Sequence, residues 1–155
     1  MQVKKNKDLV IELSTSASVI SYISNFEMGS AALYEEWAQN YEKLRETFLS
    51  FAMENEKNEK NIRRVYYGVV SDALETNFCF KGLKGDVSLP LPTYNTSYSE
   101  LLKICIHFEE SIYSFYCEAA KTAKTLFAEL PRSLERGAGL RKARLSKLRS
   151  LLVID

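Results

Sequence analysis

The sequence predicts an all-α fold, an antiparallel four-helix bundle of two repeated helical hairpins joined by a long crossover. The phrase Phe-Glu, six further residues and Tyr occurs twice, ending at Tyr34 and at Tyr116, in two otherwise apolar segments. Glycine and proline are sparse between residues 31 and 81 and then gather in the middle of the chain. A repeated pattern on both sides of a turn-rich segment indicates one hairpin used twice.

The first helix is expected at about residues 15–39. Positions seven apart lie almost above one another on an α-helix, so Glu27 and Tyr34 share one face. The same face also carries the apolar residues Ile20, Ile23 and Ala31. Glu27 therefore interrupts a stripe that would face the core. Residues 1–14, ahead of this helix, form a lead-in that is either helical or extended.

The second helix is expected at about residues 42–78, after a turn near Asn40. Its core-facing positions follow a +4, +7, +10, +14 spacing and are Phe48, Ala52, Asn55, Asn58 and Ile62. Glu54 and Glu56 lie about 100° off this stripe. The pattern therefore predicts that both are exposed to solvent.

Residues 79–97, which contain the prolines and glycines of the middle, are expected to form the crossover connection. Ser97 and Glu100 make a capping-box pattern before an apolar run, which predicts a third helix from about Tyr98 to Lys124. Its stripe repeats that of the first helix and consists of Leu102, Cys105, Glu109, Ile112 and Tyr116.

The fourth helix is expected at about residues 130–152, with Pro131 in its first turn. It repeats the spacing of the second helix with Leu134, Ala138, Arg141, Arg144 and Leu148. Gly137 and Gly139 cost about 1 kcal/mol each relative to alanine inside a helix. They indicate a close helix approach, a local distortion, or a break before a helix that starts at Leu140. Residues 15–152 then form a single domain.

Carboxylates are rarely found in a core unless they are paired or bind a metal. With Glu27 and Glu109 on repeated apolar faces, the chain resembles the rubrerythrin branch of the ferritin-like superfamily over residues 17–152. In that family, helices one and three each carry a Glu seven residues before a Tyr, and helices two and four each carry Glu-x-x-His. The resemblance implies a ferritin-like bundle in which six such side chains hold two metal ions.

Four of the six ligand positions depart from the family pattern. The second helix has Asn55 and Asn58 at the aligned places, and the fourth has Arg141 and Arg144. Two Glu-x-x-His motifs need two histidines, but the chain has one. Arginine has no lone pair to give to a cation and repels one. We therefore expect a degenerate di-iron site with no cofactor bound; if iron or manganese is bound, the candidate ligands are Glu27 and Glu109.

Without a metal, the two core carboxylates need another positive partner. Arg141 and Arg144 are expected to face Glu27 and Glu109, which returns the charge of the centre to zero. Neutral donors are available for the remaining carboxylate oxygens on Asn55, Asn58, Tyr34 and Tyr116. In the alternative arrangement, the arginines point outward and the glutamates are hydrated. The repeat also predicts that superposing the hairpins brings Glu27 onto Glu109 and Asn55 onto Arg141.

The single histidine, His107, lies about 200° around the helix from Glu109 and is expected to point away from the carboxylates. Cys79, Cys105 and Cys117 form no Cys-x-x-Cys pattern. An odd number of cysteines at these spacings argues against a disulfide framework or a zinc ribbon. Reduced, buried thiols are expected.

Composition excludes several classes of protein. The chain has 155 residues, 46% hydrophobic and 26% charged, with 21 Lys+Arg and 20 Asp+Glu. This fits one globular domain with its own core and gives neither disorder nor an overall polyanion-binding charge. No apolar run has the length of a membrane helix, and the N-terminus has no signal-peptide pattern. We expect a cytoplasmic protein without membrane contact.

The leading functional hypothesis is a catalytically silent bundle that acts as a structural or protein-interaction module, as a homodimer or with an unidentified protein partner. The alternative is a metal-binding oxidoreductase of peroxidase or oxidase type that uses Glu27 and Glu109, with Cys105 and the tyrosines as redox-active groups. Two carboxylates without an imidazole are too few ligands for a firm transition-metal site.

A third hypothesis places nucleic acid against the basic last helix. That helix carries Arg132, Arg136, Arg141, Lys142, Arg144, Lys147 and Arg149. No aromatic residues interleave with them to form a stacking platform, so no nucleic-acid partner is expected.

Overall fold

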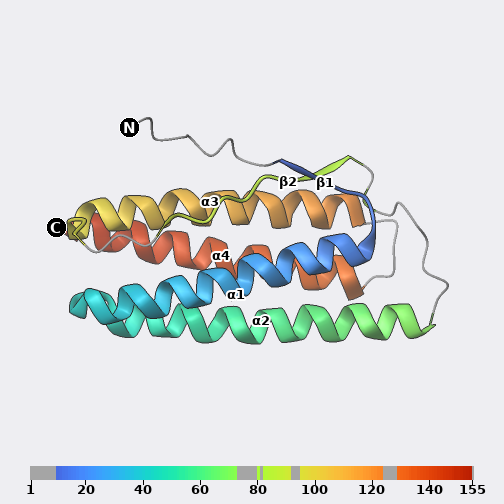
Figure 1. The fold of residues 1–155 in the computed structure, drawn as a ribbon, viewed down its shortest axis with the longest axis horizontal. Coiled ribbons are helices and arrows are strands. Elements are labelled where there is room, and N and C mark those ends of the chain that lie inside the picture. The colour runs from blue at the N-terminus through green and yellow to red at the C-terminus, as the bar shows by residue number, and fades with distance from the viewer. Residues whose placement is uncertain (1–9, 73–79, 81, 92–94, 124–128, 155) are drawn as a thin grey trace, which may run out of the picture.

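The computed structural model describes residues 10–72, 80, 82–91, 95–123 and 129–154. Four long helices form a bundle of two hairpins, as Figure 1 shows. The helices are α1 (Ser16–Asn40), α2 (Arg45–Asp72), α3 (Tyr98–Thr122) and α4 (Glu129–Ile154). The predicted all-α four-helix bundle is therefore confirmed.

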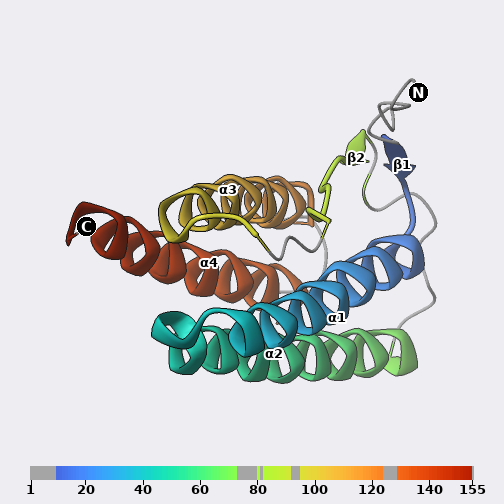
Figure 2. The ribbon, with the colours of Figure 1, turned by 60° about the vertical axis from the view of Figure 1, so that its left-hand side comes forward.

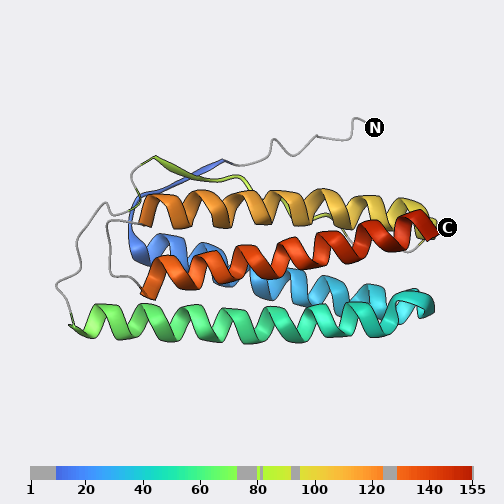
Figure 3. The same ribbon diagram turned by 180° about the vertical axis from the view of Figure 1, so that it is seen from behind.

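The two helices of each hairpin run antiparallel and pack along their length (Figure 1). Figure 1 also shows that α2 and α3 begin at the same end of the bundle, so α3 runs parallel to α2. Figure 2, turned by 60°, separates the α1/α2 hairpin from the α3/α4 hairpin. Contact between α2 and α4 joins the two hairpins, and the view from behind in Figure 3 shows α4 beside α2.

The helix starts follow local capping chemistry. Thr15 caps α1: its hydroxyl accepts from the Ser18 backbone N–H at 3.1 Å, and Ser18 Oγ accepts from the Thr15 backbone N–H at 3.2 Å. Ser97 caps α3 by accepting from the Glu100 backbone N–H at 3.2 Å. The start of the third helix at Tyr98 is thus confirmed, because the predicted cap satisfies one of the orphan donors of the first turn.

The other boundaries differ by a few residues. The first hairpin turn is a short 3₁₀ helix, Glu42–Leu44, so α2 begins at Arg45 rather than near residue 42. The end expected for the second helix, residues 73–78, lies outside the described residues, as does Lys124 at the end expected for the third. The fourth helix begins one residue earlier than expected, at Glu129, and extends to Ile154.

Two short strands were not predicted. β1 (Ile11–Leu13) pairs antiparallel with β2 (Leu83–Gly85), so the described end of the lead-in is extended and part of the crossover is a strand. Leu13 lies opposite Leu83, and both are buried. Three residues are too few for a period-two pattern to stand out in a sequence, and the pairing joins segments some 70 residues apart.

Two tyrosines fix the crossover against α1. The Tyr22 hydroxyl accepts from the Val87 backbone N–H at 2.8 Å, and the Tyr41 hydroxyl donates to the Thr96 carbonyl at 2.7 Å. They act near opposite ends of α1. None of the described helices combines the length and apolarity needed to cross a membrane.

Helix α4 is continuous through Gly137 and Gly139, so the expected possibility of a break at Leu140 is wrong. A Cβ atom on Gly137 would lie 2.9 Å from Cε1 and Cζ of Tyr116, whereas a Cβ on Gly139 would meet nothing within 4 Å. Gly137 is therefore where α4 approaches a buried ring of α3 closely. Gly139 is exposed, and the structure offers no packing reason for it.

Candidate functional site

The six aligned positions meet in the centre of the bundle. Glu27 comes from α1 and Glu109 from α3, and each side chain is fully buried. Their partners come from the second helix of each hairpin, and none is more than 6% exposed: Asn55, Asn58, Arg141 and Arg144. The apolar stripes predicted for the four helices direct these polar side chains inward, because each stripe must face the core.

Arg141 bridges the two carboxylates. Its Nη2 lies 2.9 Å from Glu27 Oε1, and its Nη1 lies 2.6 Å from Glu109 Oε1. The Arg141 side chain is 1% exposed. One planar cation thus joins the two hairpins at the level of both glutamates, so the alternative of outward-pointing arginines is wrong for Arg141.

Arg144 is the second buried cation. Its Nη1 lies 3.2 Å from Glu109 Oε1, and its Nη2 donates to the Phe51 carbonyl at 2.8 Å. Its Nε lies 3.2 Å from Glu54 Oε2. The Phe51 ring centre is 4.7 Å from the guanidinium carbon, which adds a cation–π contact.

The predicted solvent exposure of Glu54 and Glu56 holds only in part, because both residues are half-buried. The Glu54 side chain keeps 39% of its surface exposed and also pairs with the buried Arg144, which was not predicted. The 100° offset from the core stripe puts Glu54 at the edge of the α2/α4 contact, where a long arginine reaches it. Helix periodicity describes one helix at a time and does not include the reach of a neighbour.

The two tyrosines bond crosswise. The Tyr34 hydroxyl on α1 donates to Glu109 Oε1 on α3 at 2.6 Å, and the Tyr116 hydroxyl on α3 donates to Glu27 Oε1 on α1 at 2.5 Å. Each tyrosine thus donates a hydrogen bond to the glutamate of the other hairpin and not to the glutamate seven residues before it. This reciprocal exchange matches the internal repeat of the sequence.

The two asparagines behave differently from each other. Asn58 Nδ2 lies 3.3 Å from Glu27 Oε1 and 3.1 Å from the Tyr116 hydroxyl oxygen, as expected for an amide donor. Asn55 was expected to donate to a carboxylate, and this is wrong. Its Nδ2 donates instead to Ser30 Oγ at 2.6 Å and to the Glu27 carbonyl at 3.3 Å. Ser30, three residues after Glu27, is a fully buried member of the site that the stripe analysis missed.

Burial and charge set the protonation of this core. Burial lowers the pKa of Arg141, but the charges of Glu109 and Glu27 outweigh it and raise the pKa above its usual value. Burial raises the pKa values of Tyr34 and Tyr116 well above 10, and the nearby carboxylates of Glu109 and Glu27 raise them further. Both phenols therefore stay protonated and remain hydrogen-bond donors.

A second ionic group lies at the periphery of the α1/α2 hairpin. Glu59 is 5% exposed, accepts from the Ser24 hydroxyl at 2.7 Å and forms an ion pair with Arg63. This pair was not predicted, although a Glu followed four residues later by an Arg on a helix is the usual signal for it.

The donor set does not suit a di-iron centre. A carboxylate oxygen on each glutamate, Oε2, is buried without a hydrogen-bond partner. The side chains at the other four aligned positions are two arginines, which cannot ligate a cation, and two asparagines, which are weak ligands for iron. Within the described parts of the chain, no three His, Cys, Asp or Glu residues group as a metal site would require.

His107 is exposed, as expected. Cys105 is fully buried and Cys117 is half-buried, and both are free thiols. Burial raises the pKa of Cys105 well above its usual value, and the charge of Glu109 raises it further. A thiol held in its protonated form is a poor nucleophile. Cys79 lies outside the described residues.

In comparisons with known proteins, no family model, no curated protein and no solved structure matches this chain.

Proposed function

We propose that this chain is a catalytically silent, ferritin-like bundle without a metal, which serves as a structural or protein-interaction module and acts as a homodimer. The main support for a metal-free core is the position of Arg141. Its guanidinium contacts both glutamates, at 2.9 Å and 2.6 Å. In the rubrerythrin pattern these glutamates would share metal ions.

The charge balance supports this reading. Arg141 and Arg144 carry two positive charges against two negative charges on Glu27 and Glu109, and all four side chains are at most 3% exposed. A divalent cation placed between the carboxylates would lie beside two fixed cations in a poorly screened interior. The four charged side chains thus take over the structural role of a metal pair. None of the four is a redox-active group.

The test is elemental analysis of protein purified without chelator from cells grown with added iron and manganese. We expect both metals to be far below one per chain. Near-stoichiometric iron or manganese would overturn the proposal.

That opposite result would favour the alternative, a divergent oxidoreductase with Glu27 and Glu109 as ligands. The observation on its side is the unpartnered Oε2 atom of each glutamate. If metal is found, the variants Glu27→Gln and Glu109→Gln should each release it under the alternative, since an amide is a much poorer ligand than a carboxylate for these ions.

The homodimer is proposed from the outer face of α2. A groove of about 700 Å³, the α2 groove, runs along it and is lined by Glu46, Leu49, Ser50, Met53, Glu54, Glu56, Lys57 and Lys60. Met53 is 71% exposed and Leu49 42% exposed. Large apolar side chains left exposed together on one helix face are a common mark of an interaction surface.

The charges beside Met53 are self-complementary. Glu46 lies seven residues before Met53 and Lys60 seven after it, which is two helical turns in each direction on one face. If two copies of α2 pack antiparallel about Met53, Glu46 of each copy lies opposite Lys60 of the other. A two-fold axis of this kind is what an isologous dimer requires.

Sedimentation equilibrium tests this. We expect a dimer for the wild type and a monomer for Met53→Glu, since the change puts two like charges at the axis. The control is Met28→Glu on α1, an exposed methionine outside the groove, which should stay dimeric. Glu46→Lys should weaken the dimer, and adding Lys60→Glu should restore it. A monomeric wild type, or dissociation by Met28→Glu alone, would overturn this surface.

A further inference from the structure

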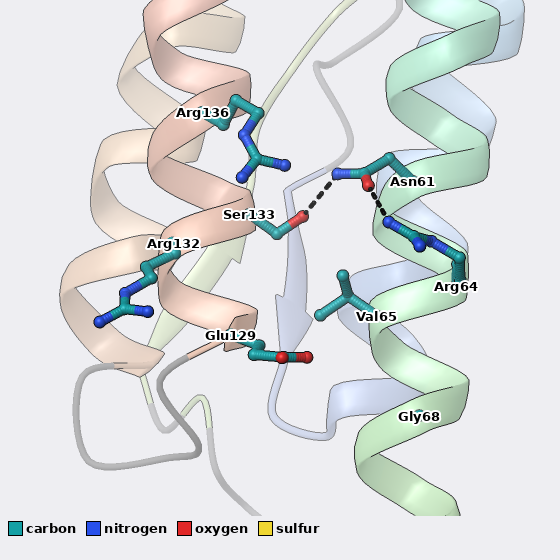
Figure 4. Close-up of a pocket in the computed structure, with 8 residues that line it drawn as sticks. All are labelled: Asn61, Arg64, Val65, Gly68, Glu129, Arg132, Ser133 and Arg136. Carbon is teal, nitrogen blue, oxygen red and sulfur yellow. Dashed lines mark hydrogen bonds between the residues drawn. The ribbon is translucent and has the colours of Figure 1, made fainter.

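A second cavity lies away from the ionic core, where the last turns of α2 meet the first turns of α4. It has a volume of about 330 Å³ and is lined by Asn61, Arg64, Val65, Gly68, Glu129, Arg132, Ser133 and Arg136. Figure 4 shows Ser133 and Arg136 of α4 facing Asn61 and Arg64 of α2 across this space, while the Arg132 side chain is directed away from α2. This volume is at the small end of ligand pockets.

The cavity concentrates arginines that lack an acidic partner. Arg64 donates to the neutral Asn61 Oδ1 at 3.0 Å. Among the described residues, neither Arg132 nor Arg136 forms an ion pair with a carboxylate. By contrast, Arg63, Arg141, Arg144 and Arg149 each have a carboxylate partner. The lining carries three positive charges against one negative charge, that of Glu129.

A chain of hydrogen bonds orients the polar floor of the cavity. Arg64 donates to Asn61, and Asn61 Nδ2 donates to Ser133 Oγ at 3.4 Å. Ser133 is 2% exposed. Its oxygen accepts from Asn61, so its own proton is left for an acceptor. The cavity also lies at the N-terminal end of α4, where the helix dipole favours an anion.

We propose that this cavity binds a small phosphate monoester that carries a hydroxyl group. The phosphate is a dianion at neutral pH, which matches the net charge of the lining. Guanidinium groups fit phosphate oxygens bidentately, and Ser133 adds a hydroxyl donor. Glu129 repels the phosphate itself but accepts a hydrogen bond from a nearby hydroxyl of the ligand, which orients the ester.

The test is isothermal titration of the full chain with two matched probes. Glycerol 3-phosphate has a phosphate and hydroxyls, and propyl phosphate has the same carbon chain without hydroxyls. We expect glycerol 3-phosphate to bind more tightly. Glu129→Ala should remove this preference and strengthen the binding of propyl phosphate, because the repulsion is gone. An unchanged preference in Glu129→Ala, or no binding of either probe to the wild type, would overturn the proposal.

The arginines are tested on the same assay. Arg136→Gln and Arg64→Gln should each weaken the binding of glycerol 3-phosphate by about tenfold or more, as expected for a lost hydrogen bond to a charged group. Both side chains are exposed at the cavity, so the variants should fold, which circular dichroism checks. The control is Lys147→Gln, which removes one exposed charge of α4 outside the cavity and should leave the affinity near that of the wild type. An equal loss in Lys147→Gln would mean that binding is only non-specific charge attraction.

Two further experiments distinguish a free phosphate ester from the phosphates of lipids and of nucleic acid. Phosphatidylcholine vesicles that contain phosphatidic acid should not retain the protein, since the proposed ligand is free in solution; retention would show a lipid headgroup site instead. A single-stranded oligonucleotide without terminal phosphates should not compete with glycerol 3-phosphate. Competition would assign the arginines to a nucleic-acid surface and overturn the proposal.

Discussion

At the scale of residues, Glu109 contacts more charged side chains of the polar core than Glu27 does. Its Oε1 atom accepts from the Tyr34 hydroxyl and lies within 3.2 Å of nitrogens of both Arg141 and Arg144. Glu27 has one arginine, Arg141, which it shares with Glu109. Removing one partner of a buried ion pair leaves an uncompensated charge, which costs far more than the pair itself contributes.

The loss of Glu109 should therefore be more harmful than the loss of its repeat equivalent. We expect Glu109→Ala and Glu27→Ala each to lower the free energy of unfolding by about 3–5 kcal/mol. The loss should be larger for Glu109→Ala, because two arginines each lose one of their carboxylate partners, whereas Glu27→Ala removes a partner of Arg141 alone. Urea denaturation measures both.

The control lies next in the chain. Glu110 pairs with Arg149 at 2.7 Å, but both side chains are about half exposed. Solvent screens such a pair, so Glu110→Ala should cost about 0–1 kcal/mol. A cost for Glu109→Ala as small as that for Glu110→Ala would mean that the core glutamates are hydrated.

The buried phenols predict how stability depends on pH. The pKa values of Tyr34 and Tyr116 are raised well above the usual 10.0, first by burial and then by the carboxylates. Above pH 10 the unfolded chain therefore releases protons that the folded chain keeps. Their contribution is complete below pH 10 and is lost as the pH rises through the folded pKa values.

We expect the free energy of unfolding to fall as the pH is raised beyond about 10. In the double variant Tyr34→Phe, Tyr116→Phe this fall should be shallower, since neither phenol can ionise in the unfolded chain. Denaturation at a series of alkaline pH values measures the slope. An equal slope in the wild type and the double variant would contradict the assigned burial of these hydroxyls.

At the scale of elements, α4 shows how two glycines in one helix differ. Gly137 is buried against Tyr116, while Gly139 is exposed and open. A glycine inside a helix costs about 1 kcal/mol relative to alanine unless its missing side chain is needed. The close approach of α3 and α4 requires Gly137 to lack a side chain; nothing in the structure requires this of Gly139.

The matched variants should move stability in opposite directions. Gly137→Ala would place Cβ 2.9 Å from a rigid, buried ring, and we expect a loss of about 1–3 kcal/mol from overpacking. Gly139→Ala should stabilise the protein by about 0.4–1 kcal/mol through the reduced entropy of the unfolded chain. Thermal denaturation measures both. Stabilisation by Gly137→Ala would mean that α3 and α4 are farther apart at this point.

At the scale of the whole molecule, the two hairpins exchange their polar contacts. Tyr34 bonds the glutamate of the second hairpin, and Tyr116 bonds the glutamate of the first. Arg141 of the second hairpin then contacts the glutamates of both. The ionic core therefore holds the hairpins together as well as filling the centre.

If this core replaces a metal pair on a retained scaffold, the ligands can be restored. The variant with Asn55→Glu, Asn58→His, Arg141→Glu and Arg144→His has the six side chains of the family pattern. We expect it to bind two divalent ions and to gain thermal stability when manganese or zinc is added. Calorimetric titration measures the stoichiometry.

Adding Glu27→Gln and Glu109→Gln to that variant should abolish the uptake and serves as its control. A quadruple variant that folds but binds no manganese, iron or zinc would sink the vestigial-site proposal. The repeated glutamate and tyrosine pattern would then serve packing alone.

The helices and the inward direction of the six site residues were predictable from the sequence. Helical periodicity is local, so the stripes through Glu27 and Glu109 and the cap at Ser97 follow from residues within a few turns of one another. The presence of Arg141 and Arg144 on an apolar stripe similarly predicted two buried cations. These predictions of burial needed no knowledge of which helices are neighbours. The expectation that the two arginines face Glu27 and Glu109 came from the resemblance to the rubrerythrin pattern.

Only the tertiary structure decided which donor meets which acceptor. The crosswise tyrosine bonds, the bridging position of Arg141 and the pairing of Glu54 with Arg144 depend on helix spacing and on the reach of long side chains between helices. The pairing of β1 with β2 and the arginine-lined cavity between α2 and α4 likewise join segments some 70 residues apart. The sequence pattern of one helix indicates which of its faces is buried, but not which helix packs against that face. The neighbour depends on how the whole core packs.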